Sequence, residues 1–168
     1  FIKSDKAQDF AAAITDKTKF IYAEMISNPA CQIGDIEALA KVAHDAGLPL
    51  IIDSTVATSF IVRTMEYGAD IVLHSATKFL GGHGTTLGGV IVESGKFNWG
   101  NGKFPTMTEP VASYGGVSWW ENFGEFGFLT KVRSEQLRDI GASLSAMSAF
   151  LLVQGVETLD PGRLAFDR

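Results

Sequence analysis

The chain has 168 residues, 46% of them hydrophobic, which suits a folded domain with a substantial core. Its formal net charge is -5 and its lysines and arginines are scattered, so the sequence lacks the basic patch typical of proteins that bind nucleic acid or anionic membranes. No apolar run approaches the roughly 20 residues of a membrane span, and no signal peptide is visible, so we expect a cytoplasmic protein.

Helices and strands alternate in the first half of the chain. An Ala-rich stretch predicts a short helix over residues 9–14, and an apolar run predicts a buried strand over residues 20–23. An amphipathic pattern predicts a helix over residues 35–46, with Asp35 as its cap and Gly47 just after its end. The remaining predictions are a loop with one helical turn over residues 58–67 and strands over residues 50–53, 71–74 and 88–92, the last after a chain reversal.

The second half of the chain has weaker periodicity. Residues 96–116 are rich in Gly, Asn, Pro and aromatic residues, and we expect a connection without regular structure that has a function or covers a site. The aromatic cluster from Trp119 to Phe128 is expected to provide core or interface anchors. Apolar spacing predicts a helix that reaches about residue 144 and another over residues 146–153.

This alternation predicts an α/β protein, a three-layer sandwich with a mainly parallel sheet and helices on both faces. In such sheets ligands bind at the carboxyl ends of the strands. Asn28, Asp53 and Lys78 each lie at or just past such an end. We therefore expect the three side chains to share one edge of the sheet.

The stretch from Asp70 to Gly84 carries the clearest chemical signal. Its apolar strand turns abruptly polar at Ser75, Thr77 and Lys78, and a glycine-rich turn follows. An amine that is partly desolvated at the mouth of a sheet is a candidate nucleophile, and the neighbouring hydroxyls and backbone N–H groups are able to hold a phosphate. Both features are needed for a Schiff base to a phosphorylated aldehyde cofactor, pyridoxal 5'-phosphate.

A pyridoxal phosphate site needs further groups, and the strand ends offer them. Asp53 is the candidate acid against the pyridine nitrogen, because a protonated ring is the electron sink of this chemistry. Asn28 is the candidate donor to the ring hydroxyl oxygen, and Ser75 and Thr77 are the candidate phosphate contacts. Taken singly, each of these residues is better explained as a cap or turn residue. Their joint position on three strand ends, together with Lys78, favours the cofactor site.

The other polar residues are assigned to structure rather than to chemistry. By strand alternation His74 points away from Ser75, and His44 lies within a helix. His83, in the glycine turn, is expected either to contact a substrate or to pack. The single cysteine, Cys31, excludes an intrachain disulfide, and we expect a reduced, buried thiol. No grouping of His, Asp and Glu has metal-ligand spacing, so no metal is predicted.

The sequence resembles the Cys/Met-metabolism family of pyridoxal phosphate enzymes, whose fold is the fold type I, aspartate-aminotransferase-like one. Within that family it is most similar to the O-acetylhomoserine sulfhydrylases. The segments that carry the resemblance are Asn28-Pro29, Asp53-Ser-Thr-Val-Ala-Thr58, Gly68-Ala-Asp-Ile-Val72, His74-Ser-Ala-Thr-Lys-Phe79, Gly81-Gly-His-Gly84 and Gln154-Gly-Val-Glu-Thr-Leu159. One departure is Ser54, where the family usually has Asn.

The resemblance implies a γ-replacement on O-acetyl-L-homoserine with sulfide or a thiol, giving homocysteine or methionine plus acetate. Lys78 would be the Schiff-base lysine, and Arg163 would be the substrate-carboxylate arginine, displaced by one position. Residues 1–145 would be the central part of the cofactor-binding large domain, and residues 146–168 would start the linker to a C-terminal domain. The full-length protein would be a tetramer.

Two alternatives stay open at the level of the sequence, and the first keeps the family but changes the reaction. The same lysine would serve a methionine γ-lyase, a cystathionine γ-synthase or a cystathionine lyase, which differ in leaving group and acceptor. The chain begins at Phe1 without methionine and stops at Arg168 in a polar stretch, so we expect a piece of a longer protein. A truncated domain that is inactive on its own is therefore the second alternative.

Overall fold

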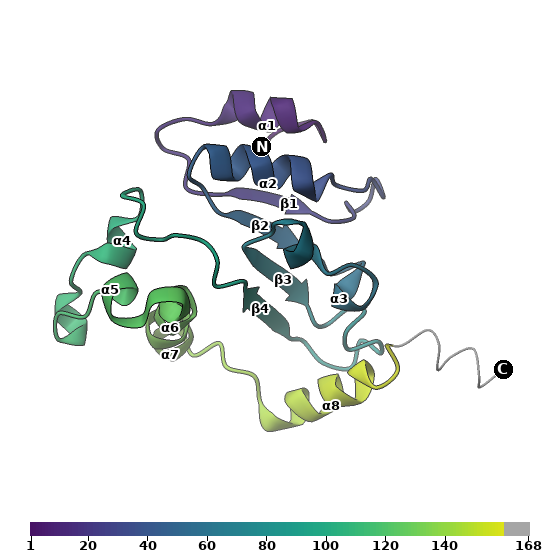
Figure 1. The fold of residues 1–168 in the computed structure, drawn as a ribbon. Helices are drawn as coiled ribbons and strands as arrows, with labels where there is room; N and C mark the ends of the chain where they lie inside the picture. The colour runs from purple at the N-terminus through teal and green to yellow at the C-terminus, as the bar shows by residue number, and fades with distance from the viewer. Residues whose placement is uncertain (160–168) are drawn as a thin grey trace. The chain divides into compact units, whose positions relative to one another are not determined.

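A computed structural model describes residues 1–159. The chain forms two compact units. The first unit comprises residues 1–92 and resumes at residue 144, and the second comprises residues 93–143. A four-stranded sheet organises the first unit, with the strands in their order along the chain (Figure 1). The strands are β1 (Ile21–Glu24), β2 (Leu50–Asp53), β3 (Ile71–Ser75) and β4 (Gly89–Glu93).

The sheet is mainly parallel, as the sequence predicts. β1 pairs with β2 in parallel, with Glu24 opposite Asp53, and β2 pairs with β3 in parallel, with Asp53 opposite Leu73. Figure 1 shows β4 pointing opposite to β3, which agrees with the predicted chain reversal. The carboxyl ends of the three parallel strands therefore meet at one edge of the sheet.

The helices of the first unit confirm the predicted order of elements. The predicted loop with one helical turn contains two short helices, and the last helix continues to residue 156 rather than 153. The helices are α1 (Ala7–Ala13), α2 (Ile36–Asp45), α3 (Thr58–Ile61), the 3-10 helix η1 (Thr64–Tyr67) and α8 (Ala146–Val156).

Helix α2 covers the sheet because its sequence is apolar at helical spacing. Its buried residues recur at intervals of three and four, and they pack in one core with the buried residues of β2 and β3. The side chain of Asp35 caps the helix by accepting a hydrogen bond from the N–H of Ala38 at 3.0 Å. Gly47, with a φ of 64°, turns the chain away after the last helical residue.

The glycines after β3 allow a close approach of backbone segments. A Cβ placed on Gly155 of α8 would collide with the backbone of Gly81, and a Cβ on Gly88 would lie 2.7 Å from Leu152. Helix α8 thus packs directly on the glycine-rich turn, and side chains at these positions would prevent it.

The second unit has more regular structure than its sequence suggests. The segment 96–116, expected to lack regular structure, contains two short helices and part of a buried aromatic cluster. The predicted long helix is broken into short pieces and ends before Gly141, whose φ is 75°. The helices are α4 (Pro105–Thr108), the 3-10 helices η2 (Ala112–Tyr114) and η3 (Gly124–Phe126), α5 (Trp119–Phe123), α6 (Gly127–Lys131), the π-helix η4 (Val132–Leu137) and α7 (Arg138–Ile140).

Aromatic side chains form the core of the second unit, and the indole N–H groups of its buried tryptophans are hydrogen-bonded. The ring of Trp99 stacks on Phe128 with centroids 4.9 Å apart, and its indole N–H donates to Glu93 at 2.9 Å. Trp119, buried as expected for a core anchor, donates to Glu135 at 3.0 Å. Because each buried indole N–H has an acceptor, the rings bury their surface without an unpaired donor.

The position of the single cysteine differs from the sequence-based expectation. Cys31 is exposed, so the expectation of a buried thiol is wrong: the residue lies in a turn with a φ of 55° rather than on a core face.

No helix among residues 1–159 is both long and apolar enough to cross a membrane.

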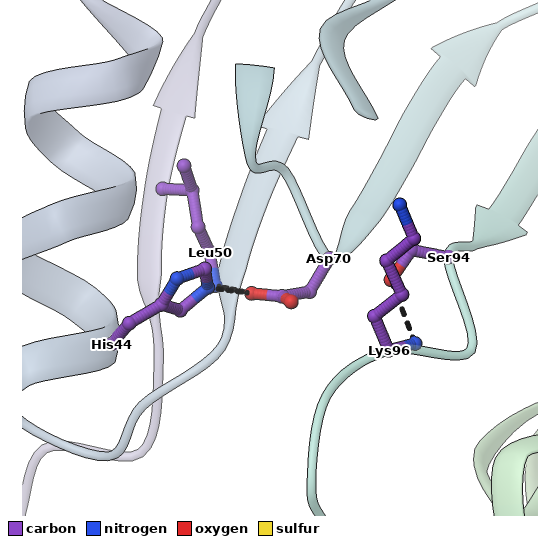
Figure 2. A network of polar contacts seen from close by, with 5 residues as sticks. All are labelled: His44, Leu50, Asp70, Ser94 and Lys96. Atoms are coloured by element: carbon purple, nitrogen blue, oxygen red, sulfur yellow. Dashed lines mark hydrogen bonds and ion pairs between the residues drawn. The ribbon is translucent and has the colours of Figure 1, made fainter. Parts of the chain in front are cut away.

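Asp70 links three elements of the first unit through one carboxylate oxygen (Figure 2). This oxygen accepts from the N–H of Leu50 at 2.8 Å and lies 2.8 Å from Nε2 of His44 on α2. The N–H of Asp70 in turn donates to the carbonyl of Leu50 at 2.9 Å. Asp70 thereby joins the start of β2, the start of β3 and the end of α2.

We expect Asp70→Ala to lower the free energy of unfolding by about 1–3 kcal/mol, because it leaves the buried N–H of Leu50 without a partner. Urea denaturation measures the loss. Asp45→Ala is the control, since that carboxylate pairs only with Lys41 on the surface and its removal should change little. Equal losses in the two variants would contradict the role of Asp70.

Candidate active site

Four of the five side chains assigned to the cofactor line one cavity of about 220 Å³. Asn28 follows β1, Asp53 ends β2, Ser75 ends β3, and Lys78 lies in the turn after it. The cavity lies where the carboxyl ends of the parallel strands meet. The structure therefore brings together an amine, a carboxylate, an amide and a hydroxyl from three successive strand ends.

The carboxylate of Asp53 is held on both of its oxygens. Oδ1 accepts from the N–H of Thr55 at 2.9 Å, and Oδ2 accepts from the hydroxyl of Tyr22 on β1 at 3.2 Å. The hydroxyl of Thr55 also accepts from the N–H of Ser75 at 2.8 Å. This chain of hydrogen bonds runs from β1 through the end of β2 to the end of β3 and fixes the floor of the cavity.

Asn28 is positioned by its backbone. Its N–H donates to Oε2 of Glu24, the last residue of β1, at 2.8 Å. Glu24 lines the same cavity, and its register partner on β2 is Asp53. The turn after β1 is thereby tied to the strand, which leaves the amide of Asn28 at the cavity wall.

Lys78 lies in the cavity wall, but it is exposed rather than partly buried, which corrects the sequence-based expectation. Its N–H donates to the carbonyl of Ser75 at 3.1 Å, so the chain turns out of the sheet immediately after β3. This turn carries the lysine past the edge of the sheet, where residues 1–159 leave it open to solvent.

Two predicted site residues are not seen to share the cavity. Thr77 is absent from its lining, and its hydroxyl accepts from the N–H of Gly88 at 3.0 Å and lies 3.3 Å from the carbonyl of that residue. It therefore joins the turn after β3 to the start of β4. Arg163 lies outside the described residues.

His74 faces a different cavity, of about 650 Å³, in agreement with its predicted orientation away from Ser75. Its Nδ1 lies 3.2 Å from the carbonyl of Ser54, and it is buried. Burial lowers the pKa of His74 below 6.5, against the opposing effects of the Ser54 carbonyl and the Asp53 carboxylate. A structural role follows from this packing.

Three residues that hold the site are not indicated by the sequence motifs: Glu24 and Thr55, which line the cavity, and Tyr22, which lies beside it. Strand alternation places Tyr22 and Glu24 on the same face of β1, which was the available signal. The hydrogen bond from Tyr22 to Asp53 depends on the register between β1 and β2, which periodicity does not reveal, whereas the one between Asn28 and Glu24 is local. Among residues 1–159 no group of three or more His, Cys, Asp or Glu is placed to hold a metal ion.

This donor set fits pyridoxal phosphate. An amine able to bind an aldehyde and an ionisable carboxylate able to face a pyridine nitrogen lie in the wall of one cavity. An amide and a hydroxyl complete the polar lining, and both are suited to the oxygen atoms of such a cofactor. Fold and site together therefore define an α/β enzyme class that uses a phosphorylated aldehyde.

Comparison with known proteins agrees with this class. Residues 1–164 match the family described as Cys/Met metabolism PLP-dependent enzyme. The chain is 54% identical over 162 residues to sulfhydrylase FUB7 of Fusarium oxysporum, covering 95% of the chain and 37% of that protein. It is 47% identical to O-acetyl-L-homoserine sulfhydrylase of Leptospira meyeri, covering 95% of the chain and 38% of that protein.

A solved structure extends the likeness to the fold. A Campylobacter jejuni protein, whose crystal structure contains N'-pyridoxyl-lysine-5'-monophosphate, has a TM-score of 0.85 and 34% identity. The match covers 92% of this chain and 37% of that one. The chain belongs to the Cys/Met metabolism family of pyridoxal-phosphate-dependent enzymes and has part of their fold type I architecture. It spans somewhat over a third of the length of these relatives.

The lowered pKa of His74 predicts a pH dependence of stability. The unfolded chain takes up a proton near pH 6.5, whereas the folded chain takes it up only at lower pH, so the free energy of unfolding should fall as pH drops below 6.5. His74→Gln should flatten this part of the curve in urea denaturation at several pH values. The exposed His83 provides the control, and an equal flattening by His83→Gln would contradict the assignment.

Proposed function

We propose that the protein of which this chain is a part catalyses γ-replacement on O-acetyl-L-homoserine with sulfide or a thiol, giving homocysteine or methionine plus acetate. The observation that carries the proposal is the cavity shared by Lys78 and Asp53 at the strand ends. The relative from Leptospira meyeri, an O-acetyl-L-homoserine sulfhydrylase, supports the choice of substrate. The activity is proposed for the whole protein because the chain covers only part of its relatives.

Lys78 is the proposed catalytic residue. Its amine would hold the cofactor through the aldehyde and, once displaced by the amino group of the substrate, would act as both base and acid. When bound, pyridoxal phosphate supplies an electron-poor ring that withdraws charge from the substrate. Nζ of Lys78 would remove protons first from Cα and then from Cβ of the substrate. Acetate would leave from Cγ with the electrons of the C–O bond, the thiolate sulfur would add at Cγ, and Lys78 would return protons to Cβ and Cα. The exposed position of Lys78 leaves its amine free to reach these atoms.

The other residues are proposed to bind and orient the cofactor and the substrate. Asp53 would face the ring nitrogen and favour its protonated form, and Asn28 would donate to the ring hydroxyl oxygen. Ser75 and Thr77 are proposed to hold the phosphate. Thr77 would do so beside the contacts that it makes with Gly88. Arg163 is the proposed partner of the substrate carboxylate.

The wider organisation is also proposed from the family. Residues 1–145 would belong to the cofactor-binding large domain, and residues 146–168 would begin the linker to a C-terminal domain. The whole protein would be a cytoplasmic homotetramer, with a small amino acid and sulfide or a thiol as substrates and without nucleic-acid or membrane partners.

The lysine assignment predicts a covalent label at one position. With pyridoxal phosphate, the chain should show a visible absorbance band, and borohydride followed by peptide mapping should place the cofactor on Lys78. Lys78→Ala should abolish this label, whereas Lys17→Ala, at an exposed lysine far from the cavity, should retain it. A label on another lysine would overturn the assignment. Complete absence of the band would favour a domain that is inactive alone.

The reaction itself is tested with the full-length protein. O-acetyl-L-homoserine plus sulfide should give homocysteine and acetate, and Lys78→Ala should abolish detectable turnover because, among residues 1–159, no other lysine lines the cavity. Methionine alone or cystathionine alone should not be cleaved at a comparable rate. Cleavage of either as the main reaction would assign the protein to a lyase of the same family instead.

A further inference from the structure

Tyr22 lies beside the proposed site without lining it. Its hydroxyl donates to Oδ2 of Asp53 at 3.2 Å, whereas the lining of the 220 Å³ cavity includes Asp53 and not Tyr22. The phenol comes from β1, and the carboxylate comes from the end of β2. Any effect of Tyr22 on a molecule in the cavity must therefore pass through Asp53.

The hydrogen bonds of Asp53 leave its carboxylate little freedom to rotate. The N–H of Thr55 holds Oδ1 from within the same chain segment, and the phenol of Tyr22 holds Oδ2 from the neighbouring strand. Removing one of the two donors would allow the carboxylate to turn about its last bond. At 3.2 Å the phenolic contact is long for an O–H···O pair, so its effect is to orient rather than to bind tightly.

The phenol is also suited to remain a donor. Partial burial, followed by the negative charges of Asp53 and Glu24, raises the pKa of Tyr22 from 10 to about 12. The proton therefore stays on Tyr22 throughout the pH range in which enzymes work. A hydroxyl that stays protonated can donate to the carboxylate throughout that range.

We propose that Tyr22 is a positioning residue for the cofactor: its hydroxyl holds the Asp53 carboxylate turned so that a pyridine nitrogen in the cavity meets it. This inference rests on the proposed function, because it takes Asp53 to be the partner of that nitrogen. Tyr22 does not line the cavity, so the role proposed for it is positioning rather than catalytic. The hydrogen bond to Asp53 requires a hydroxyl at position 22. Phenylalanine would keep the ring and lose the hydrogen bond.

The contact itself is tested without cofactor. In the chain labelled with ¹³C at tyrosine Cζ, NMR titration should show one phenol that ionises near pH 12 and is missing from Tyr22→Phe. In Asp53→Asn its pKa should fall between 10 and 12, because the charge of Asp53 is removed while burial, the larger cause, remains. An unchanged pKa in Asp53→Asn would overturn the inference.

The consequence is tested with pyridoxal phosphate. Tyr22→Phe should raise the dissociation constant, measured by visible absorbance, about tenfold, as expected for a hydrogen bond to a charged group. Tyr67→Phe, at an exposed phenol on η1, is the matched control and should leave it unchanged. A purely structural role would lower the melting temperature of Tyr22→Phe while keeping the dissociation constant, which would overturn the proposal.

The two measurements separate the two proposals. If the wild-type chain takes up no pyridoxal phosphate at Lys78, the proposed function fails for this chain, and the phenol titration alone decides whether Tyr22 holds Asp53. If the cofactor binds and Tyr22→Phe binds it as tightly as wild type does, the proposed function stands and the role of Tyr22 is refuted.

Discussion

The carboxylate of Asp53 is the constraint on which the site depends. It ends a buried strand, and donors from two different segments hold its two oxygens. The parallel register between β1 and β2 sets Glu24 opposite this residue, so the turn that carries Asn28 begins beside it. A shift of one residue in that register would turn Tyr22 and Glu24 to the other face and dismantle the cavity.

Two features of the sequence predict part of this arrangement: the positions at which the strands end, and the alternation of side chains along each strand. Each parallel strand is an apolar run followed by a polar residue, so the edge at which Asn28 and Asp53 meet can be inferred without coordinates. Alternation also separates Ser75 from His74, and the two residues do face different cavities. The resemblance to the family also assigns Lys78 to the cofactor, and Lys78 is among the residues that line the cavity.

The remaining features depend on contacts between residues that are distant in sequence. The hydroxyl of Tyr22 reaches a carboxylate on the next strand, and no local pattern indicates that contact. The aromatic residues of segment 96–116 have no period, yet Trp99 builds a core by stacking on Phe128. The exposure of Lys78 is set by the turn after β3, which the apolar strand pattern does not describe.

The central claim is that the amine of Lys78 and the carboxylate of Asp53 act on one ring. A crystal structure of the chain grown with pyridoxal phosphate tests this most directly. The account predicts the ring in the 220 Å³ cavity, joined to Lys78, with its nitrogen within hydrogen-bonding distance of Asp53. Cofactor bound in the larger cavity beside His74, or a ring nitrogen turned away from Asp53, would contradict it.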